Sequence, residues 1–174
     1  MRGFRWTGLP IFLALALLLS AGRGGCTSAE KPALKTAPDF TLELYGSPAG
    51  KTLTLSEVSR ENPVLLIFWA TWCPTCVAEI RDINQWQKRT RSRGVKVLGV
   101  SIEDSPEKIR KLQTRFPMEY ATVMDRDGRV AELYGVDSLP TVVLLAKGGK
   151  ILYYGFHLPQ ELERLLLTQS QDAP

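Results

Sequence analysis

Histidine and cysteine are scarce in this sequence, and their scarcity excludes several kinds of site. The 174 residues contain one histidine, His157, and three cysteines, Cys26, Cys73 and Cys76. A structural zinc site takes about four ligands of these types, so every one of them would have to converge. A haem attachment motif needs histidine directly after the second cysteine of a Cys-x-x-Cys pair, and Val77 stands there. We therefore expect neither a metal nor a cofactor.

Disulfide pairs are also lacking outside one motif. The domain that follows the N-terminal segment keeps only Cys73 and Cys76, so an apolar core has to stabilise it. Hydrophobic residues make up 44% of the chain and charged residues 23%, which is ordinary for a globular protein. The length favours one domain, and there is no internal repeat or low-complexity segment.

Excess positive charge is confined to the first residues. The chain has 22 Lys and Arg against 18 Asp and Glu, a net charge of +4. Arg2, Arg5 and Arg23 account for all but one unit of this excess, because no acid precedes residue 26. The remaining domain is therefore nearly neutral, and its charge gives no reason to expect nucleic-acid binding.

Residues 1–26 have the layout of a secretory signal, with a basic start, an apolar run over 11–19 and small residues over 20–22. The uncharged stretch 6–22 is at the short limit of about 17–25 residues for a spanning helix, so an uncleaved anchor is the alternative. Cys26 resembles the lipid-modified cysteine of bacterial lipoproteins, although Arg23 stands where that signal has an apolar residue; an unpaired linker thiol is the alternative. We expect a signal, lipoprotein or membrane anchor over 1–26, a linker over 27–37, a domain over 38–168 and a frayed tail over 169–174.

The two remaining cysteines lie where a strand gives way to a helix. The apolar run 64–69 predicts a buried strand, and a helical pattern follows from Val77 to about Arg93. Residues three apart on a first helical turn share a face, so the sulfurs of Cys73 and Cys76 can approach bonding distance. Pro74 suits the first helical position because its missing N–H would have no helical partner.

This position favours redox chemistry. Unpaired N–H groups and the helix dipole stabilise a thiolate at a helix start and lower its pKa. We expect Cys73 to be the exposed nucleophile and Cys76 the resolving thiol. The alternative is a passive staple, but a loop this short removes little unfolded-state entropy compared with the roughly 3 kcal/mol of a 15-residue loop.

The rest of the chain predicts a mixed α/β sheet. Strands are expected over 40–44, 52–55, 64–69, 95–100, 120–123, 139–145 and 150–156, with hairpins at 46–50 and at Gly148-Gly149. A helical turn is expected over 56–58, and helices over 77–93, 105–116 (Ser105 as N-cap), 129–134 and 159–167. Parallel strands linked by helices and finished by an antiparallel hairpin form a sheet with helices on both faces.

These residues resemble a known family. The segment Trp69-Ala70-Thr71-Trp72-Cys73-Pro74-Thr75-Cys76, with Leu139-Pro140-Thr141 later, is similar to the active site of thioredoxin-fold proteins, especially the exported, membrane-associated TlpA/ResA/CcmG-type thiol–disulfide oxidoreductases. The resemblance covers about residues 38–167. It implies a thioredoxin fold with an extra N-terminal β-hairpin.

The resemblance also implies roles for individual residues. Cys73 would attack a substrate disulfide and Cys76 would resolve the mixed disulfide. Pro140 matches a cis-proline facing the cysteines, and the backbone of Leu139 would pair with an extended substrate segment. Glu79 matches an acidic residue that would pass the proton of Cys76; a surface helix acid is the alternative. The substrate groove would be formed by Trp72, Pro74, Thr75, Leu139 and Pro140, whereas Trp69 and Trp86 would pack in the core.

Two residues depart from the family pattern. Ile67 stands where cytoplasmic thioredoxins have aspartate and CcmG-like proteins often have asparagine, which leaves Glu79 to carry proton traffic. Thr141 stands where CcmG-like proteins have glutamate, which weakens a specific assignment to cytochrome c maturation.

The leading hypothesis is an extracytoplasmic, monomeric reductant of disulfides in exported proteins, recharged by a membrane electron donor. The haem-binding cysteine pair of an apocytochrome c is one candidate substrate. One alternative is a copper chaperone using Cys73, Cys76 and His157, although the copper-assembly proteins it resembles space their cysteines one residue further apart. Another is a thiol peroxidase, but Ala70 replaces the threonine expected three residues before its reactive cysteine. If the copper-chaperone alternative does not hold, we expect His157 to be a surface residue at the end of a strand.

Overall fold

The computed structural model describes residues 34–48, 50–161 and 164–165. The expected signal, Cys26, most of the linker and the frayed tail lie outside these residues. None of the helices in the described part of the chain is long and apolar enough to cross a membrane.

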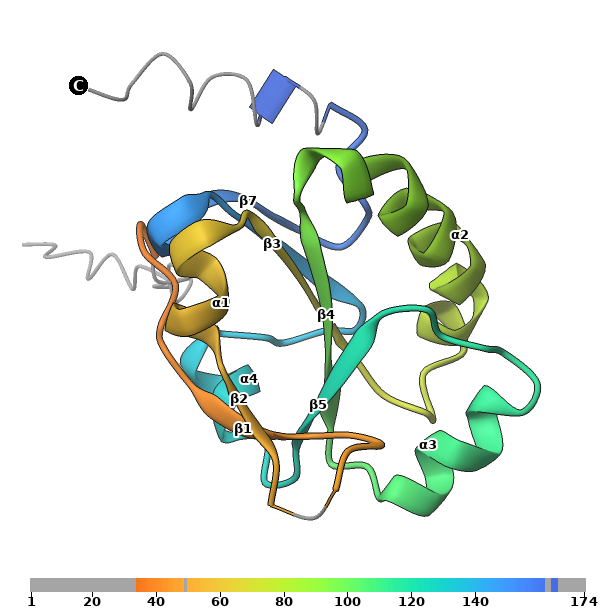
Figure 1. The fold of residues 1–174 in the computed structure, drawn as a ribbon. Helices are drawn as coiled ribbons and strands as arrows, with labels where there is room; N and C mark the ends of the chain where they lie inside the picture. The colour runs from red at the N-terminus through yellow and green to blue at the C-terminus, as the bar shows by residue number, and fades with distance from the viewer. Residues whose placement is uncertain (1–33, 49, 162–163, 166–174) are drawn as a thin grey trace, which may run out of the picture. The chain divides into compact units, whose positions relative to one another are not determined.

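Within the described residues, seven strands form one mixed sheet in the order β2-β1-β5-β4-β3-β6-β7 (Figure 1). Strands β3, β4 and β5 are parallel, and the other pairings are antiparallel, including the N-terminal hairpin β1–β2. The predicted mixed sheet and hairpin are therefore confirmed. The strands are β1 (Thr41–Leu44), β2 (Thr52–Thr54), β3 (Val64–Trp69), β4 (Lys96–Ile102), β5 (Ala121–Asp125), β6 (Thr141–Leu145) and β7 (Ile151–Gly155).

The helices connect these strands. Helix α3 begins as predicted, with Pro106 first and the Ser105 hydroxyl accepting a hydrogen bond from Lys108 N. Gly94, at φ +72°, follows the 3₁₀ turn that ends the long helix after the cysteines. The helices are α1 (Leu55–Glu61), α2 (Pro74–Thr90), α3 (Pro106–Gln113) and α4 (Arg129–Leu133), with 3₁₀ turns η1 (Arg91–Arg93) and η2 (Lys147–Gly149).

Three local predictions were wrong in detail. The helical turn expected over 56–58 is the seven-residue helix α1, because Leu55 and Val58 pack together on the core. Helix α2 ends at Thr90 rather than 93. The β6–β7 connection contains three turn residues, not two, and Ala146 N donates to Lys150 O across it (2.8 Å). Of the C-terminal helix expected over 159–167, the described residues 164–165 are helical and 160–161 form a turn.

Side chains of β3 alternate between two cores, one on each face of the sheet. Leu65, Ile67 and Trp69 pack with Ile83 of α2 and Ile109 of α3. Val64, Leu66 and Phe68 pack instead with Leu55 of α1 and with Tyr134, which directly follows α4. Because both faces are covered, β3 reads as a continuous apolar run, and the strand can hold the residues after Trp69 rigidly.

The parallel strands define two edges of the sheet. Strands β3, β4 and β5 all end at the edge that carries Cys73, and we call this the disulfide edge. The opposite edge carries the starts of β3 and β4 and the β6–β7 turn, because Val64 pairs with both Lys96 and Leu145.

Candidate active site: a disulfide at the start of α2

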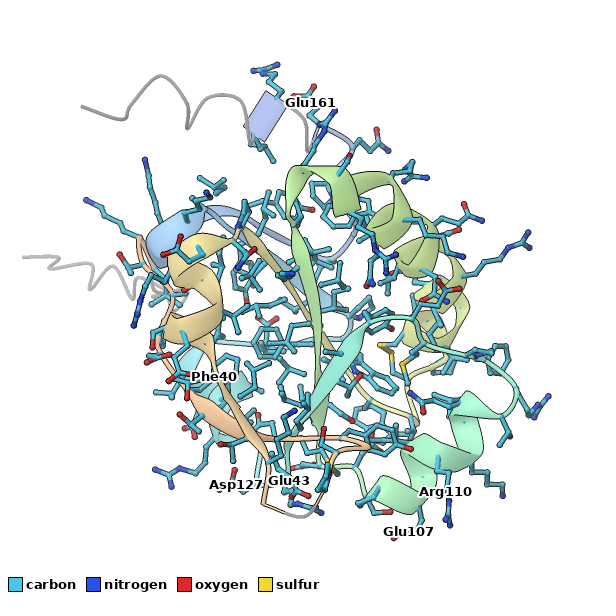
Figure 2. The ribbon with its side chains drawn as sticks, viewed as in Figure 1. Phe40, Glu43, Glu107, Arg110, Asp127 and Glu161 are labelled. Carbon is cyan, nitrogen blue, oxygen red and sulfur yellow. A yellow bond between two sulfur atoms is a disulfide. The ribbon has the colours of Figure 1, made fainter. Side chains whose placement is uncertain are left out.

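Cys73 and Cys76 form a disulfide at the start of α2, with their Cα atoms 5.3 Å apart (Figure 2). Cys73 is the N-cap of the helix and Pro74 occupies its first turn, as the sequence predicted. The backbone N–H of Cys76 donates to Cys73 Sγ at 3.2 Å. A helix N–H group without a helical acceptor therefore faces the Cys73 sulfur, which is the arrangement that stabilises a thiolate.

Both cysteines are buried, so the expected exposure of Cys73 was wrong. Cys73 retains 5% of its accessible surface and Cys76 3%. The difference between them is one of access, because Cys73 lines a surface groove of about 680 Å³ and Cys76 does not. Neighbouring segments cover most of Cys73, and the groove reaches what remains accessible.

The groove beside Cys73 is formed largely by the residues predicted for it. Trp72 is 61% exposed and lines the groove with Pro74, Thr75 and Leu139. Pro140 follows a cis peptide bond but is itself buried, so Leu139 presents the surface. Three acidic side chains, which the sequence did not suggest, also line the groove: Glu103, Glu132 and Asp137.

The loop before Cys73 is held by Asp104, a residue that the sequence analysis missed. Its buried carboxylate accepts hydrogen bonds from Thr71 N (2.8 Å), the Thr71 hydroxyl and the Ser101 hydroxyl (2.8 Å). These bonds connect the end of β4 to the loop after β3. An acid two residues after the buried strand β4 was the available signal, and it does not reveal a partner 33 residues away.

Glu79 lies one turn after Cys76 and is partly buried, with 20% of its side chain exposed. Its Oε1 is 3.7 Å from His157 Nδ1, and its Oε2 is buried without a hydrogen-bond partner among the described residues. Burial raises the pKa of Glu79, and the nearby Asp82 carboxylate adds to the rise while His157 opposes it. A carboxyl of this kind can hold a proton closer to neutrality than an exposed one.

His157 follows β7 at the surface, with 82% of its side chain exposed, as the sequence analysis expected. Within the described residues, no group of three His, Cys, Asp or Glu side chains could hold a metal ion. Ala70 is buried and its carbonyl accepts from Cys73 N at 3.1 Å, so no hydroxyl stands at this position for the thiol-peroxidase alternative.

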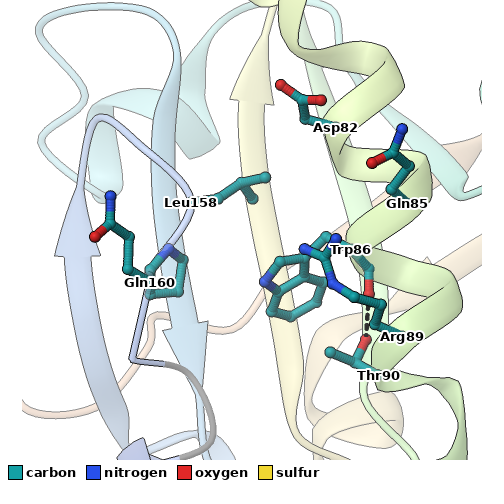
Figure 3. A pocket seen from close by; sticks show the side chains of 8 residues that line it. Asp82, Gln85, Trp86, Arg89, Thr90, Leu158 and Gln160 are labelled. Atoms are coloured by element: carbon teal, nitrogen blue, oxygen red, sulfur yellow. Dashed lines mark hydrogen bonds between the residues drawn. The ribbon is translucent and has the colours of Figure 1, made fainter.

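A second cavity, of about 310 Å³, lies away from the cysteines between α2 and the segment after β7 (Figure 3). Trp86 faces Leu158 across it, and the Thr90 hydroxyl donates to Trp86 O at 3.0 Å. Trp69 and Trp86 are only 2% and 4% exposed, which confirms their predicted place in the core.

Comparisons with known proteins agree with this geometry. The AhpC/TSA family model matches residues 33–154, which include the disulfide and Pro140. The chain is 34% identical over 116 residues to the thiol-disulfide oxidoreductase ResA of Geobacillus thermodenitrificans, covering 67% of this chain and 64% of that protein. It is 32% identical over 133 residues to ResA of Geobacillus kaustophilus, covering 75% and 74%.

The first of these matches spans slightly less than two thirds of the relative's length. Among solved structures, a thiol-disulfide oxidoreductase from Bacteroides fragilis superposes with a TM-score of 0.66 at 28% identity, covering 76% of this chain and 100% of that one. The fold, the position of the disulfide and these likenesses lead to one conclusion. The chain belongs to the AhpC/TSA family and, within it, to the ResA-like thiol-disulfide oxidoreductases of the thioredoxin fold.

Proposed function

We propose that this protein reduces disulfides in exported proteins by dithiol–disulfide exchange at Cys73 and Cys76. One observation carries the proposal: the disulfide that caps α2 opens through Cys73 onto a groove bordered by Leu139. The groove is large enough for a segment of polypeptide, and Cys73 is the cysteine that such a segment would meet.

The reaction starts from the reduced dithiol. The Cys73 thiolate attacks one sulfur of the substrate disulfide, forming a mixed disulfide and releasing one substrate thiolate. The Cys76 thiolate then attacks Cys73 Sγ, which releases the second substrate thiolate and forms the intramolecular disulfide. Two electrons pass to the substrate, and its two sulfurs take up two protons.

Glu79 is the proposed proton acceptor for Cys76, whose thiol is more deeply buried than Cys73. Cys76 must lose its proton before it can attack, and burial in apolar surroundings opposes that loss. Glu79 is three residues further along α2, on the same face, and the raised pKa of its carboxyl suits it to accept and return a proton.

The substrate is proposed to bind as an extended segment. The backbone of Leu139, beside the cis bond to Pro140, would pair with it as a short added strand, while Trp72, Pro74 and Thr75 border the reacting sulfurs. Main-chain pairing tolerates many sequences, so this groove suits a reductant of several exported proteins. An apocytochrome c, with its haem-binding cysteine pair, is one such substrate, although Thr141 departs from the CcmG-like pattern.

The proposed location is outside the cytoplasm, with the N-terminal segment holding the protein at the membrane by a lipid on Cys26 or by an uncleaved anchor. The apolar run over residues 11–19 and the basic residues before it support export. A membrane thiol donor would return two electrons to the Cys73–Cys76 disulfide after each cycle.

The test is reduction of insulin by the dithiol form of the full chain. Cys73→Ser should reduce turnover to background, because no other thiol borders the groove within the described residues. Cys26→Ser is the matched control and should retain activity. Turnover by Cys73→Ser would refute the role.

The equilibrium potential of the Cys73–Cys76 pair against glutathione tests the direction. Thioredoxin-fold proteins span about −270 to −120 mV, and a value near the negative end supports a reductant. A value near about −120 mV would make the protein an oxidant.

A further inference from the structure

The opposite edge of the sheet gathers basic side chains from segments far apart in the sequence. Strand β4 starts there, and Lys96 N donates to Pro63 O at 2.9 Å. The end of α1 and the η2 turn meet there as well, since a Cβ on Gly149 would lie 3.8 Å from Ser59 Oγ. Three exposed acids are described along this edge: Glu57 and Glu61 of α1, and Glu119, which precedes β5 and pairs with Lys88 at 2.9 Å. The other exposed charged residues that we group there are basic: Lys35, Arg60, Arg91, Arg93, Lys96, Lys147 and Lys150.

Two described residues of the neighbouring C-terminal segment carry opposite charges. Glu161 and Arg164 lie beyond β7, and their side chains pair with each other at 3.2 Å. Figure 2 shows Glu161 on this side of the domain and Glu107 and Asp127 on the other. Because the chain after residue 26 is nearly neutral, the basic edge leaves an excess of acids elsewhere, including the three that line the groove.

The chain also enters the described domain at the basic edge. Thr36 bridges Lys150, and Ile151 N donates to Lys35 O at 3.0 Å, so residues 35–36 are fixed beside the β6–β7 turn. The described part of the chain therefore begins beside this edge. The stretch from Cys26 to Lys35 can reach about 30 Å when fully extended, so it is long enough to let the basic edge contact a membrane that holds residue 26.

We infer that the basic edge docks on anionic lipid headgroups and holds the disulfide groove away from the membrane. This inference rests on the proposed attachment of the N-terminal segment to a membrane. Lysines and arginines near an anionic surface are attracted to it over about one Debye length of 8–10 Å, so the edge next to the linker responds most. The acids around the groove are repelled by the same surface. The two effects act together to present Cys73 to soluble substrates.

The experiment uses the full chain held by its N-terminal segment in lipid nanodiscs of phosphatidylcholine alone or mixed with phosphatidylglycerol. Hydrogen–deuterium exchange is followed at the basic edge, over residues 91–97 and 147–151, and around the groove. We expect roughly tenfold slower exchange at the basic edge in anionic discs, no change around the groove, and loss of the effect in high salt.

Two charge-reversal variants distinguish an effect of the basic edge from an effect of the protein's net charge. Lys35→Glu/Lys96→Glu/Lys147→Glu should lose the protection. Lys51→Glu/Lys108→Glu/Lys111→Glu changes the net charge by the same amount, on exposed lysines before β2 and in α3, and should keep the protection. Equal exchange in both lipids, protection at the groove, or loss in the second variant alone would overturn the inference.

If the N-terminal segment does not retain the chain in discs, the unsubstituted chain and the two charge-reversal variants are sedimented with vesicles of the same two lipid compositions. Selective binding to anionic vesicles that only the Lys35/Lys96/Lys147 variant loses would support docking, and its absence would refute it. Insulin reduction in solution does not depend on this edge, so failure of the docking proposal leaves the redox proposal standing, and the reverse also holds.

Discussion

The disulfide edge and the basic edge of the same sheet are held together by different kinds of bonds. At the disulfide edge, side chains hold the loops: Asp104 binds the Thr71 loop, and Asp125 accepts from the backbone N–H groups of Val130 (3.2 Å) and Ala131 (2.8 Å) at the start of α4. At the basic edge, main-chain bonds hold the β6–β7 turn, with Ala37 N donating to Gly149 O at 2.9 Å.

This difference suits two different roles. A loop held by a buried carboxylate can keep a reactive group such as Cys73 in a fixed position, but it depends on a few side chains. An edge held by main-chain bonds leaves its side chains available to meet solvent or a surface, and it tolerates their replacement. Substitutions should therefore have unequal effects at the two edges, and the largest effect is expected where a carboxylate is buried.

Asp104→Ala should have the largest effect on stability. It leaves Thr71 N, the Thr71 hydroxyl and the Ser101 hydroxyl without their acceptor, so we expect a loss of about 3 kcal/mol in the free energy of unfolding. Urea unfolding measures it. Asp104→Asn, which keeps one acceptor oxygen, should lose less.

Glu132→Ala is the control for Asp104→Ala, because it removes an exposed acid from the same edge and should change stability by no more than about 0.5 kcal/mol. Equal losses in the Asp104 and Glu132 variants would contradict the difference between buried and exposed carboxylates.

At the basic edge, a change to the backbone should matter more than a change of charge. Gly149 has φ +84° and open space at its Cβ position, with Ser59 Oγ 3.8 Å away, so Gly149→Ala strains the main chain without a clash. The left-handed conformation should cost about 1–2 kcal/mol, measured by urea unfolding. Lys147→Ala, two residues earlier, should be neutral within about 0.5 kcal/mol. A larger loss from Lys147→Ala would show that side chains also hold the β6–β7 turn.

Local sequence patterns predicted most of the framework and the reactive pair. The apolar run of β3, the Ser105 cap and the position of Cys73 before Pro74 all depend on neighbours within a few residues, which periodicity and capping preferences report directly. The seven strands followed for the same reason.

The features that were missed depend on contacts between distant segments. Asp104 binds a loop 33 residues earlier, and no local pattern names that partner. The burial of Cys73 depends on how the segment around Leu139 and the end of β4 close around it. Similarly, the basic edge exists only because the sheet order brings Lys35, Lys96 and Lys147 together.

The smallest predicted effect is on the pH dependence of stability. It compares Glu79, a partly buried carboxyl at the disulfide edge, with Glu61, an exposed carboxyl at the basic edge. Burial raises the pKa of Glu79 above its ordinary value of 4.5, so the folded protein binds a proton there more readily than the unfolded chain does. This contribution to stability is complete below pH 4.5 and is lost as the pH rises through the higher folded-state pKa. Glu79→Gln has no charge to bury, so relative to the unsubstituted chain it should gain stability as the pH rises from 4 towards 7.

Unfolding measured across that range checks the sign, and Glu61→Gln, at an exposed position of the basic edge, is the matched control that should show little trend. Replacing His157 with Ala should make the stability difference due to Glu79 depend more steeply on pH. The reason is that His157, 3.7 Å away, opposes the rise in the Glu79 pKa. The same pH series can be run on insulin reduction, where Glu79→Gln should slow turnover if the carboxyl takes the Cys76 proton. If Glu79→Gln is more stable but less active than the unsubstituted chain near neutral pH, the partly buried carboxylate serves the chemistry at the expense of stability.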